Sequence, residues 1–268
     1  MRIKEIESSS LVTKSQLPEA DYVVNPYVGC SHGCVYCYAR FMKRFTGHQE
    51  PWGEFVDIKI NAGELAGREL PKIGERTVLL SSVTDPYQPL ERKYQLTRQI
   101  LEQAVITDTP VSILTKSDLV LRDLDLLRQL SNCGVGMSFS TADDRVRRIF
   151  EPRSSSVEQR LNALNVIKNS GIRTYAFLGP ILPGLTDLEA LFERVAQVKV
   201  DLVMAENLNM EGAIFPSLIN TIQNHYSNLV DLYHQIKRNP RDYWEPVKTE
   251  IVELANRHQL PVKLYFDH

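Results

Sequence analysis

The segment that decides the fold is NPYVGCSHGCVYCYAR, residues 25–40. It carries three of the four cysteines of the chain in the spacing C-x3-C-x2-C, namely Cys30, Cys34 and Cys37. The segment follows directly on an apolar, strand-like run. Its glycines Gly29 and Gly33 give the backbone the freedom to wrap three thiolates around one inorganic centre. Clustered cysteines of this kind indicate metal or redox chemistry rather than disulfides.

Three thiolates satisfy three irons of a cubane [4Fe–4S] cluster and leave one iron without a protein ligand. Closed clusters usually have four cysteines. An open iron is therefore a place for a substrate or cofactor, as the open position of a catalytic zinc site is. The alternative is a zinc ion that the cysteines share with His32 or His48. Zinc sites commonly use paired knuckles or histidine pairs at a wider spacing, so this spacing favours the cluster.

Apolar runs and segments of helical period alternate along the rest of the chain. The runs are short and mostly continuous, which predicts strands buried on both faces of a parallel sheet. The six runs cover residues 21–28, 77–82, 111–116, 134–140, 173–180 and 201–209. Amphipathic stripes between them predict helices that face the sheet. These stripes cover residues 95–105, 119–130, 157–168 and 188–198.

Repeated strand–helix units predict an α/β protein with right-handed crossovers. Six units fit either a doubly wound sheet or an incomplete barrel. We expect one unit over residues 1–215 and a mainly helical C-terminal extension over residues 216–268, packed on the same core. The extension ends in VKLYF, a predicted last strand. The polar residues 40–76 have weak periodicity and are expected to be irregular.

The overall composition bounds the function. The 268 residues are 43% hydrophobic and 24% charged, as in ordinary globular proteins. No run of 18 apolar residues occurs and the N-terminus has no apolar core, so we expect a cytoplasmic protein without a membrane partner. The net charge of −2 is not the strongly basic footprint that usually marks binding to the phosphate backbone of nucleic acids. A positively charged surface near the open end of the barrel, which we call the mouth, would have to be local. Its candidate residues are Lys43, Arg44, Arg145, Arg147, Arg148 and Arg153.

The cysteine spacing, with Tyr36 just before the third cysteine, resembles the motif of the radical S-adenosylmethionine (SAM) enzymes. In that family the open iron is chelated by the amino and carboxylate groups of SAM. The reduced cluster donates one electron, and cleavage yields methionine and a 5′-deoxyadenosyl radical that abstracts hydrogen from substrate. The resemblance implies a [4Fe–4S] cluster on the three cysteines, SAM as cofactor, and a partial (β/α)6 parallel barrel. It also implies a reductant such as a flavodoxin or ferredoxin.

Polar side chains follow nearly every expected strand, at the edge where the active sites of parallel barrels collect. Lys116 suits the SAM carboxylate or ribose, and Ser138 or Ser140 suits the methionine portion. Helix capping is an equal explanation for several neighbouring residues, and a surface ion pair is an equal explanation for Arg153. The complete set of expected cofactor-binding residues is Tyr36, Ser82, Asp85, Lys116, Ser138, Ser140, Arg153 and Glu206.

Five segments together look like the spore photoproduct lyase-like branch of this family, namely the cysteine segment PYVGCSHGCVYCYAR and, further along, TDPYQPLE, ILTKS, SFSTAD and EPRSSSVEQRL. In spore photoproduct lyase two tyrosines flank the third cluster cysteine, and Tyr36 and Tyr38 match them as expected catalytic residues. A redox-active cysteine near the end of the second strand completes the splitting of a thymine dimer there, whereas SSVTDPYQ has none. The resemblance therefore carries the radical-generating half of the reaction, with a nucleic-acid lesion as one candidate substrate.

Two alternatives stay open. One is an iron–sulfur electron-transfer or binding protein without SAM chemistry, which needs a fourth ligand such as His32 or Cys133. The other is a DNA lesion lyase in the narrow sense. Cys133 precedes the fourth expected strand, toward the bottom of a barrel, and we expect it to be an inert buried thiol.

Overall fold

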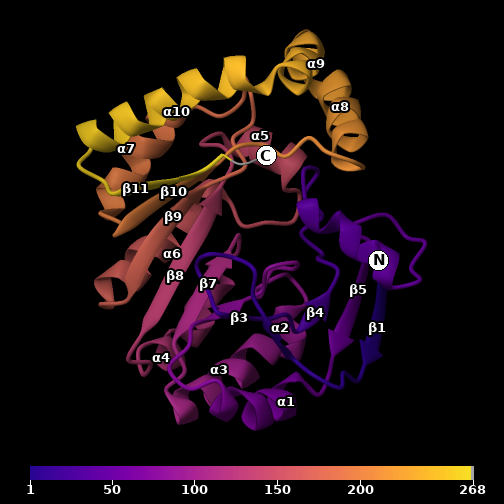
Figure 1. Cartoon of the computed structure of the whole chain (residues 1–268), viewed down its shortest axis with the longest axis vertical. Coiled ribbons are helices and arrows are strands. Elements are labelled where there is room, and N and C mark those ends of the chain that lie inside the picture. The colour runs from indigo at the N-terminus through magenta and orange to yellow at the C-terminus, as the bar shows by residue number, and fades with distance from the viewer. Residues whose placement is uncertain (267–268) are drawn as a thin grey trace.

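An eight-stranded sheet organises the computed structural model, which describes residues 1–266 (Figure 1). The strand order is β11-β10-β9-β8-β7-β6-β3-β2, and every neighbouring pair is parallel except β2 with β3. The strands are β2 (Val12–Lys14), β3 (Tyr22–Val24), β6 (Val78–Leu80), β7 (Val111–Thr115), β8 (Cys133–Phe139), β9 (Arg173–Leu178), β10 (Leu202–Glu206) and β11 (Val262–Tyr265). The predicted α/β class with a partial parallel barrel is confirmed.

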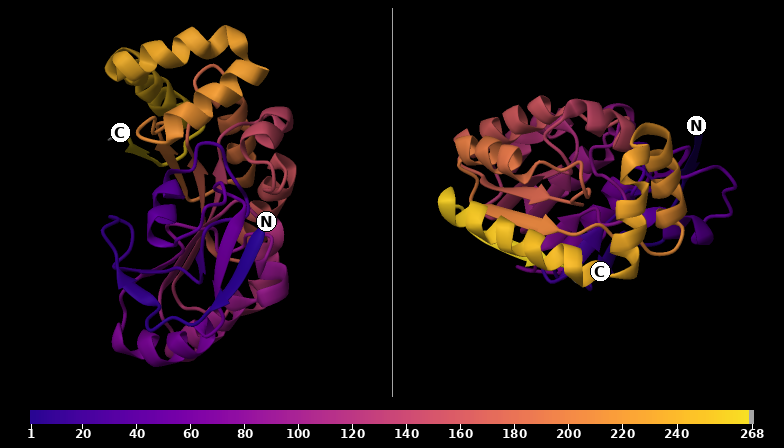
Figure 2. Two further views of the ribbon diagram at one scale, coloured as in Figure 1. Left: turned by 90° about the vertical axis from the view of Figure 1, so that its right-hand side faces the viewer. Right: turned by 90° about the horizontal axis from the view of Figure 1, so that it is seen from above.

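Helices connect the parallel strands and lie outside the curved sheet (Figure 2). They are α2 (Glu91–Tyr94), α3 (Leu96–Thr107), α4 (Leu124–Leu127), α5 (Asp144–Phe150), α6 (Val157–Asn169) and α7 (Leu188–Val198). The stripe predicted for α6 is buried, and Ser156 with Gln159 forms a capping box at its N-terminus. The single helix predicted over residues 119–130 is wrong, because a 3-10 helix, η3 (Asp118–Asp123), precedes the short α4.

A second sheet of three strands, in the order β1-β5-β4, stands beside the cysteine segment. Its strands are β1 (Arg2–Ile6), β5 (Phe55–Lys59) and β4 (Tyr27–Val28). The strand predicted over residues 21–28 is therefore two strands in two sheets. Pro26 lies between them and has no N–H to continue a ladder, while its carbonyl accepts a hydrogen bond from Lys59 N of β5 (3.1 Å).

The irregular segment predicted over residues 40–76 is wrong. It contains β5, most of the 3-10 helix η1 (Tyr38–Phe45), helix α1 (Ala62–Glu69) and the 3-10 turn η2 (Leu70–Lys72). Apart from Leu65, the packing face of α1 is built from small residues, which leave only a weak hydrophobic period in the sequence. A Cβ atom at Gly63 would lie 2.7 Å from Gln99 of α3, and one at Gly67 would lie 2.9 Å from Gln103. These glycines let α1 and α3 approach closely.

The C-terminal part is mainly helical, with α8 (Ile214–His225), η4 (Ser227–Leu229), α9 (Val230–Arg238) and α10 (Pro240–Arg257). Its final strand, β11, pairs in parallel with β10, so this part also supplies the last strand of the main sheet. Strands β11 and β2 are the two ends of the strand order. Glu19, between β2 and β3, accepts hydrogen bonds from Lys263 and Tyr265 of β11, so one carboxylate bridges the two ends.

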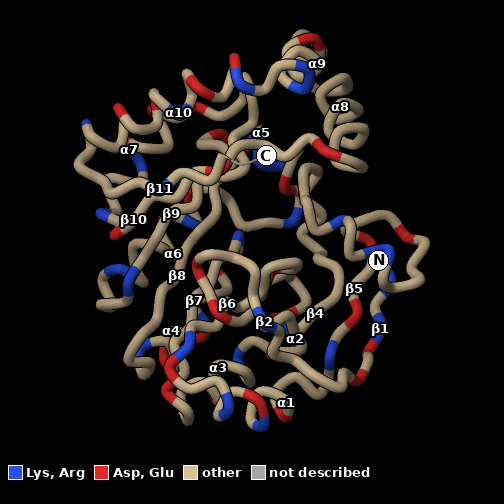
Figure 3. Tube along the Cα trace, viewed as in Figure 1, with Lys and Arg blue, Asp and Glu red and all other residues tan. Residues whose placement is uncertain are grey.

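Charged residues of both signs are interspersed along the chain trace (Figure 3). Within residues 1–266, no helix combines the length and the apolar character that crossing a bilayer requires.

Candidate active site

The three clustered cysteines lie on the loop between β4 and η1. Gly33 N donates a hydrogen bond to Cys30 O, and Cys37 N donates one to Cys34 O, each at 3.3 Å. The backbone therefore turns tightly twice. Gly29 and Gly33 have φ angles of +87° and +65°, a conformation that side chains other than glycine rarely adopt. Cys30 and Cys34 are buried, whereas Cys37 is half-buried.

The thiols lie near enough to affect one another's ionisation. Burial, together with the charges of Asp85 and Cys37, raises the pKa of Cys30 to about 12. Burial also raises the pKa of Cys34, which Lys116 opposes and the other two thiols reinforce. Three neighbouring thiolates become stable only when bound cations compensate their charge, so this donor set fits a thiolate-bound iron cluster.

The donors are not arranged around a single ion. Within residues 1–266, no three His, Cys, Asp or Glu side chains converge as one metal ion requires. A cubane does not need that convergence, because each of its cysteines binds a different iron. His32 Nδ1 lies 3.0 Å from Arg153 O, and its Nε2 lies 3.3 Å from Asp85. His48 Nε2 lies 2.8 Å from Asp57. Both imidazoles are therefore engaged with other groups, whereas the zinc alternative requires one of them as a ligand beside the thiols.

The segment after α5 holds the cysteine loop from its other side. Val35 N donates a hydrogen bond to Phe150 O at 2.9 Å. Arg153 Nη1 donates to Ser31 O at 3.0 Å, and the same guanidinium forms an ion pair with Glu54. The ion pair of Arg153 with a carboxylate, one of the two explanations considered for this residue, is present. The contacts of Arg153 named here are with protein oxygens, and they hold the cysteine loop in place.

The buried carboxylate of Glu151 lies at the centre of the contacts behind the cysteine loop, and we call this group of residues around Glu151 the wall. Glu151 accepts hydrogen bonds from Tyr36 Oη, Ser140 Oγ (2.7 Å) and Arg160 Nη2. Burial opposes its charge, but Arg160 and then Lys116 outweigh that effect and hold the pKa of Glu151 at about 2. Neither Glu151 nor Arg160 is among the predicted site residues. Both lie in the EPRSSSVEQR segment, but no spacing rule marks them as a pair.

The predicted residues on β7 and β8 meet at this wall. Arg160 Nη1 donates to Ser138 O at 2.6 Å, and Ser138 Oγ donates to Gly179 O at 3.1 Å. The Lys116 ammonium lies 5.9 Å from the centre of the Tyr36 ring. Burial lowers the pKa of Lys116, but its electrostatic interactions with Cys34, Glu151 and Asp85 outweigh burial and raise it. Lys116 is therefore a charged cation beside the cysteine loop.

Asp85 ties the end of β6 to the end of β7. It accepts hydrogen bonds from Thr115 Oγ1 (2.6 Å), Tyr87 N (2.8 Å) and Lys116 N (2.9 Å). Burial would raise its pKa, but the facing His32 and these donors hold it at about 2. The carboxylate is thus saturated by protein donors, which is the pattern of a structural bridge rather than of a ligand for a cofactor.

Tyr38, Ser82 and Glu206 form a second group at the mouth. Tyr38 Oη donates a hydrogen bond to Ser82 O, just after β6. Burial, with the charges of Cys37 and Glu206, raises the pKa of Tyr38. Half of the Tyr38 side chain is nevertheless exposed. The two flanking tyrosines therefore differ, because Tyr36 is buried against Glu151, whereas Tyr38 is half-exposed and reaches Ser82.

Cys133 stands apart from both groups. It is the first residue of β8, opposite Val111, whereas Ser138 and Ser140 lie at the other end of that strand. Burial raises the pKa of its thiol to about 12. The position is the one expected from the sequence. Three of the basic residues predicted near the mouth form ion pairs, Arg145 with Asp143, and Arg147 and Arg148 with the shared Asp144.

Comparison with known proteins places this arrangement in context. The family model described as Radical SAM superfamily matches residues 24–195. The uncharacterized protein MJ0683 of Methanocaldococcus jannaschii is 39% identical over 189 residues, which cover 70% of this chain and 71% of that protein. A spore photoproduct lyase of Clostridium acetobutylicum is 29% identical over 171 residues, which cover 61% of this chain and 47% of that enzyme.

The fold also has solved counterparts. The structure of spore photoproduct lyase complexed with dinucleoside spore photoproduct superimposes with a TM-score of 0.70. The match covers 98% of this chain and 82% of that one at 16% identity, so it supports the fold alone.

Proposed function

The chain belongs to the radical SAM superfamily, and from this membership we propose that Cys30, Cys34 and Cys37 hold a [4Fe–4S] cluster whose open iron binds SAM. When bound, such a cluster supplies the electron that cleaves SAM to methionine and a 5′-deoxyadenosyl radical, which abstracts hydrogen from substrate. The observation that carries the proposal is the tightly turned loop with three neighbouring thiols and no fourth cysteine beside them.

The side chains around the loop are suited to the methionine end of SAM. Lys116 is a cation beside Cys34 and pairs with the SAM carboxylate in this proposal. Ser138 and Ser140 each give their hydroxyl proton to a protein oxygen. Their own oxygens are left with lone pairs only, so they can accept from the SAM ammonium.

The two tyrosines take different roles in the proposal. Glu151 holds the Tyr36 hydroxyl in a buried position, which suits a residue that orients the cluster loop. Tyr38 exposes half of its side chain at the mouth, which suits a residue that faces substrate.

The substrate class we propose is a modified nucleotide of a nucleic acid. The support is the sequence similarity to a spore photoproduct lyase and the fold shared with that enzyme in complex with a dinucleoside photoproduct. Of the four cysteines, three are the proposed ligands and Cys133 begins β8 at the opposite end from Ser138. No thiol is therefore placed to return hydrogen, which supports a reaction other than thymine-dimer splitting.

The proposal is tested by anaerobic reconstitution with iron and sulfide, followed by dithionite and SAM. We expect 5′-deoxyadenosine and methionine in equal amounts. Cys37→Ala is expected to abolish product, and Cys133→Ala, a matched buried control, is expected to retain it. A fully loaded wild-type sample that yields no 5′-deoxyadenosine refutes the proposal. A reduced-cluster EPR signal that is indifferent to SAM identifies the chain instead as an iron–sulfur protein without SAM chemistry.

A further inference from the structure

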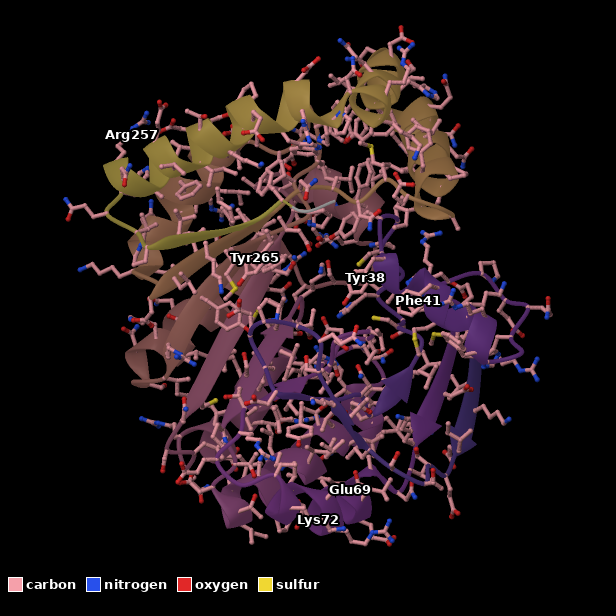
Figure 4. All side chains as sticks on the ribbon, viewed as in Figure 1. Tyr38, Phe41, Glu69, Lys72, Arg257 and Tyr265 are labelled. Carbon is pink, nitrogen blue, oxygen red and sulfur yellow. The ribbon has the colours of Figure 1, made fainter. Side chains whose placement is uncertain are left out.

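The exposed aromatic side chains of the protein gather on one short helix. Among the large hydrophobic side chains that residues 1–266 expose, the aromatic ones are Tyr38 (50%), Phe41 (42%) and Phe45 (66%). All three belong to η1, and Figure 4 shows the first two on this helix. Exposed apolar side chains that gather in one place mark an interaction site on a soluble protein.

The same helix is positively charged. Its sequence YARFMKRF contains two arginines and one lysine but no acidic residue. The Arg44 guanidinium lies 5.4 Å from the ring centre of Phe41 and 4.6 Å from that of Phe45, within cation–π range. We call the surface formed by Phe41, Arg44 and Phe45 the η1 patch. Arginine and aromatic residues are the types that anchor protein interfaces.

The η1 patch is attached directly to the cysteine loop. Cys37 is the N-cap residue of η1. The Arg40 guanidinium of η1 donates hydrogen bonds to the carbonyl oxygens of Cys34 and Val35. An electron that reaches the proposed cluster from outside must cross a short distance, because tunnelling rates fall steeply with separation. A surface helix that begins at a cluster ligand provides such an approach.

We propose that the η1 patch is the docking surface for an acidic one-electron carrier protein, of the flavodoxin or ferredoxin kind, that reduces the cluster. The inference rests on the proposed function. In the step, the carrier loses one electron and the cluster gains it, and no bond is made or broken. The chain carries a net charge of −2, which repels an acidic partner. A local cationic patch overcomes that repulsion and steers the encounter.

A single-stranded nucleic acid is the competing occupant, since bases also stack on aromatic and arginine side chains. Affinity for a strand, however, comes from many unpaired cations that neutralise phosphates. Lys43 donates to the carbonyl oxygen of Gln49, and Arg153 is paired with Glu54. Arg40 and Lys43 keep their charges, because their partners are neutral carbonyl oxygens, and they add to the positive potential of η1. Their side chains are turned toward the backbone, so Arg44 is the cation that lies over the exposed rings, and this arrangement suits a small, transient protein interface better than a phosphate track.

The test compares two electron donors on cluster-loaded protein. The patch variants are Phe41→Ala/Phe45→Ala and Arg44→Glu. The matched controls are Ile106→Ala on α3, where the side chain is 75% exposed, and Arg128→Glu after α4. 5′-Deoxyadenosine formation is measured with dithionite and, separately, with an acidic flavodoxin kept reduced by its reductase. Binding of that flavodoxin to each variant is measured in parallel by anaerobic calorimetry.

With flavodoxin we expect the patch variants to lose about tenfold in kcat/KM for the carrier, as truncation of aromatic anchors does. With dithionite we expect all variants to match the wild type. Patch variants that match the wild type with both donors overturn the inference, and so does an equal loss with both donors. Weakened binding of a poly-dT oligonucleotide with unchanged flavodoxin binding assigns the patch to nucleic acid and also overturns it.

The outcome is separable from that of the proposed function. If dithionite yields no 5′-deoxyadenosine even from the wild type, the proposed function fails, and flavodoxin binding alone decides the docking. Weaker binding by the patch variants than by the controls then supports the docking surface, and equal binding overturns it.

Discussion

Replacing Arg160 by methionine should destabilise the protein severely. The Glu151 and Arg160 side chains are 0% and 1% exposed, and they form an ion pair at the centre of the wall behind the cysteine loop. Removing one partner of a buried pair leaves an uncompensated charge and costs about 3–5 kcal/mol. That is a large part of the roughly 5–15 kcal/mol by which domains are stable. At about 2–4 °C per kcal/mol for a chain of this size, Tm should fall by roughly 6–20 °C.

The assay is urea unfolding of the metal-free protein, followed by circular dichroism, for a double-mutant cycle. Glu151→Gln alone leaves Arg160 as the unpaired charge and should also be costly. The double variant Glu151→Gln/Arg160→Met buries no charge, so it should be more stable than the sum of the single losses predicts, by about 2 kcal/mol or more. The reasoning is refuted if Arg160→Met costs less than about 1 kcal/mol, or if the two changes add within about 0.5 kcal/mol.

Three further predictions concern the same wall and its loop. Gly53→Ala places a Cβ atom 2.7 Å from the backbone of the cysteine loop, at a residue whose φ is +92°. The amount of iron that each chain binds on reconstitution should therefore fall. The control Gly74→Ala, where φ is +63° and the surrounding space is open, should bind iron normally. Because the pKa of Glu151 is lowered to about 2, the stabilising effect of its charge is complete above about pH 4.5 and is lost as the pH falls toward 2. Over that range the urea midpoint of the wild type should therefore fall more than the midpoint of Glu151→Gln. Parallel curves of midpoint against pH would contradict this. Tyr36→Phe should lower the unfolding free energy by about 1–2 kcal/mol, since it removes a donor from a buried carboxylate. Tyr38→Phe should be nearly neutral in the same measurement, and equal losses would argue against the different roles of the two tyrosines.

The elements that the sequence predicted well are those with a strong periodic signal. Strands β7 to β10 and helices α3, α6 and α7 bury continuous apolar runs or full stripes, and they appear close to their predicted ranges. Helix α1 was missed because glycine and alanine, with the single leucine Leu65, form its packing face. Strand β5 was missed because it contains Asp57, whose burial depends on a distant partner, His48.

The candidate site divides in the same way. Cysteine spacing is a local pattern, so the proposed cluster ligands could be found without a structure. The roles of Glu151 and Arg160 depend on how α5 and α6 pack behind the loop, which no local pattern encodes. Conversely, Asp85 looked like a ligand because it follows a strand, but tertiary contacts saturate its carboxylate.

The contacts that shape the cysteine loop have a consequence for how the protein matures. Tyr36 and Ser31 are held by Glu151 and Arg153, which the ribosome adds more than a hundred residues later. The loop therefore acquires its geometry only after β8 and α5 have been synthesised and have packed. Iron and sulfide delivered earlier would meet a segment whose cysteines are not yet held together. For the proposed cluster, this order places insertion after the packing of β8 and α5.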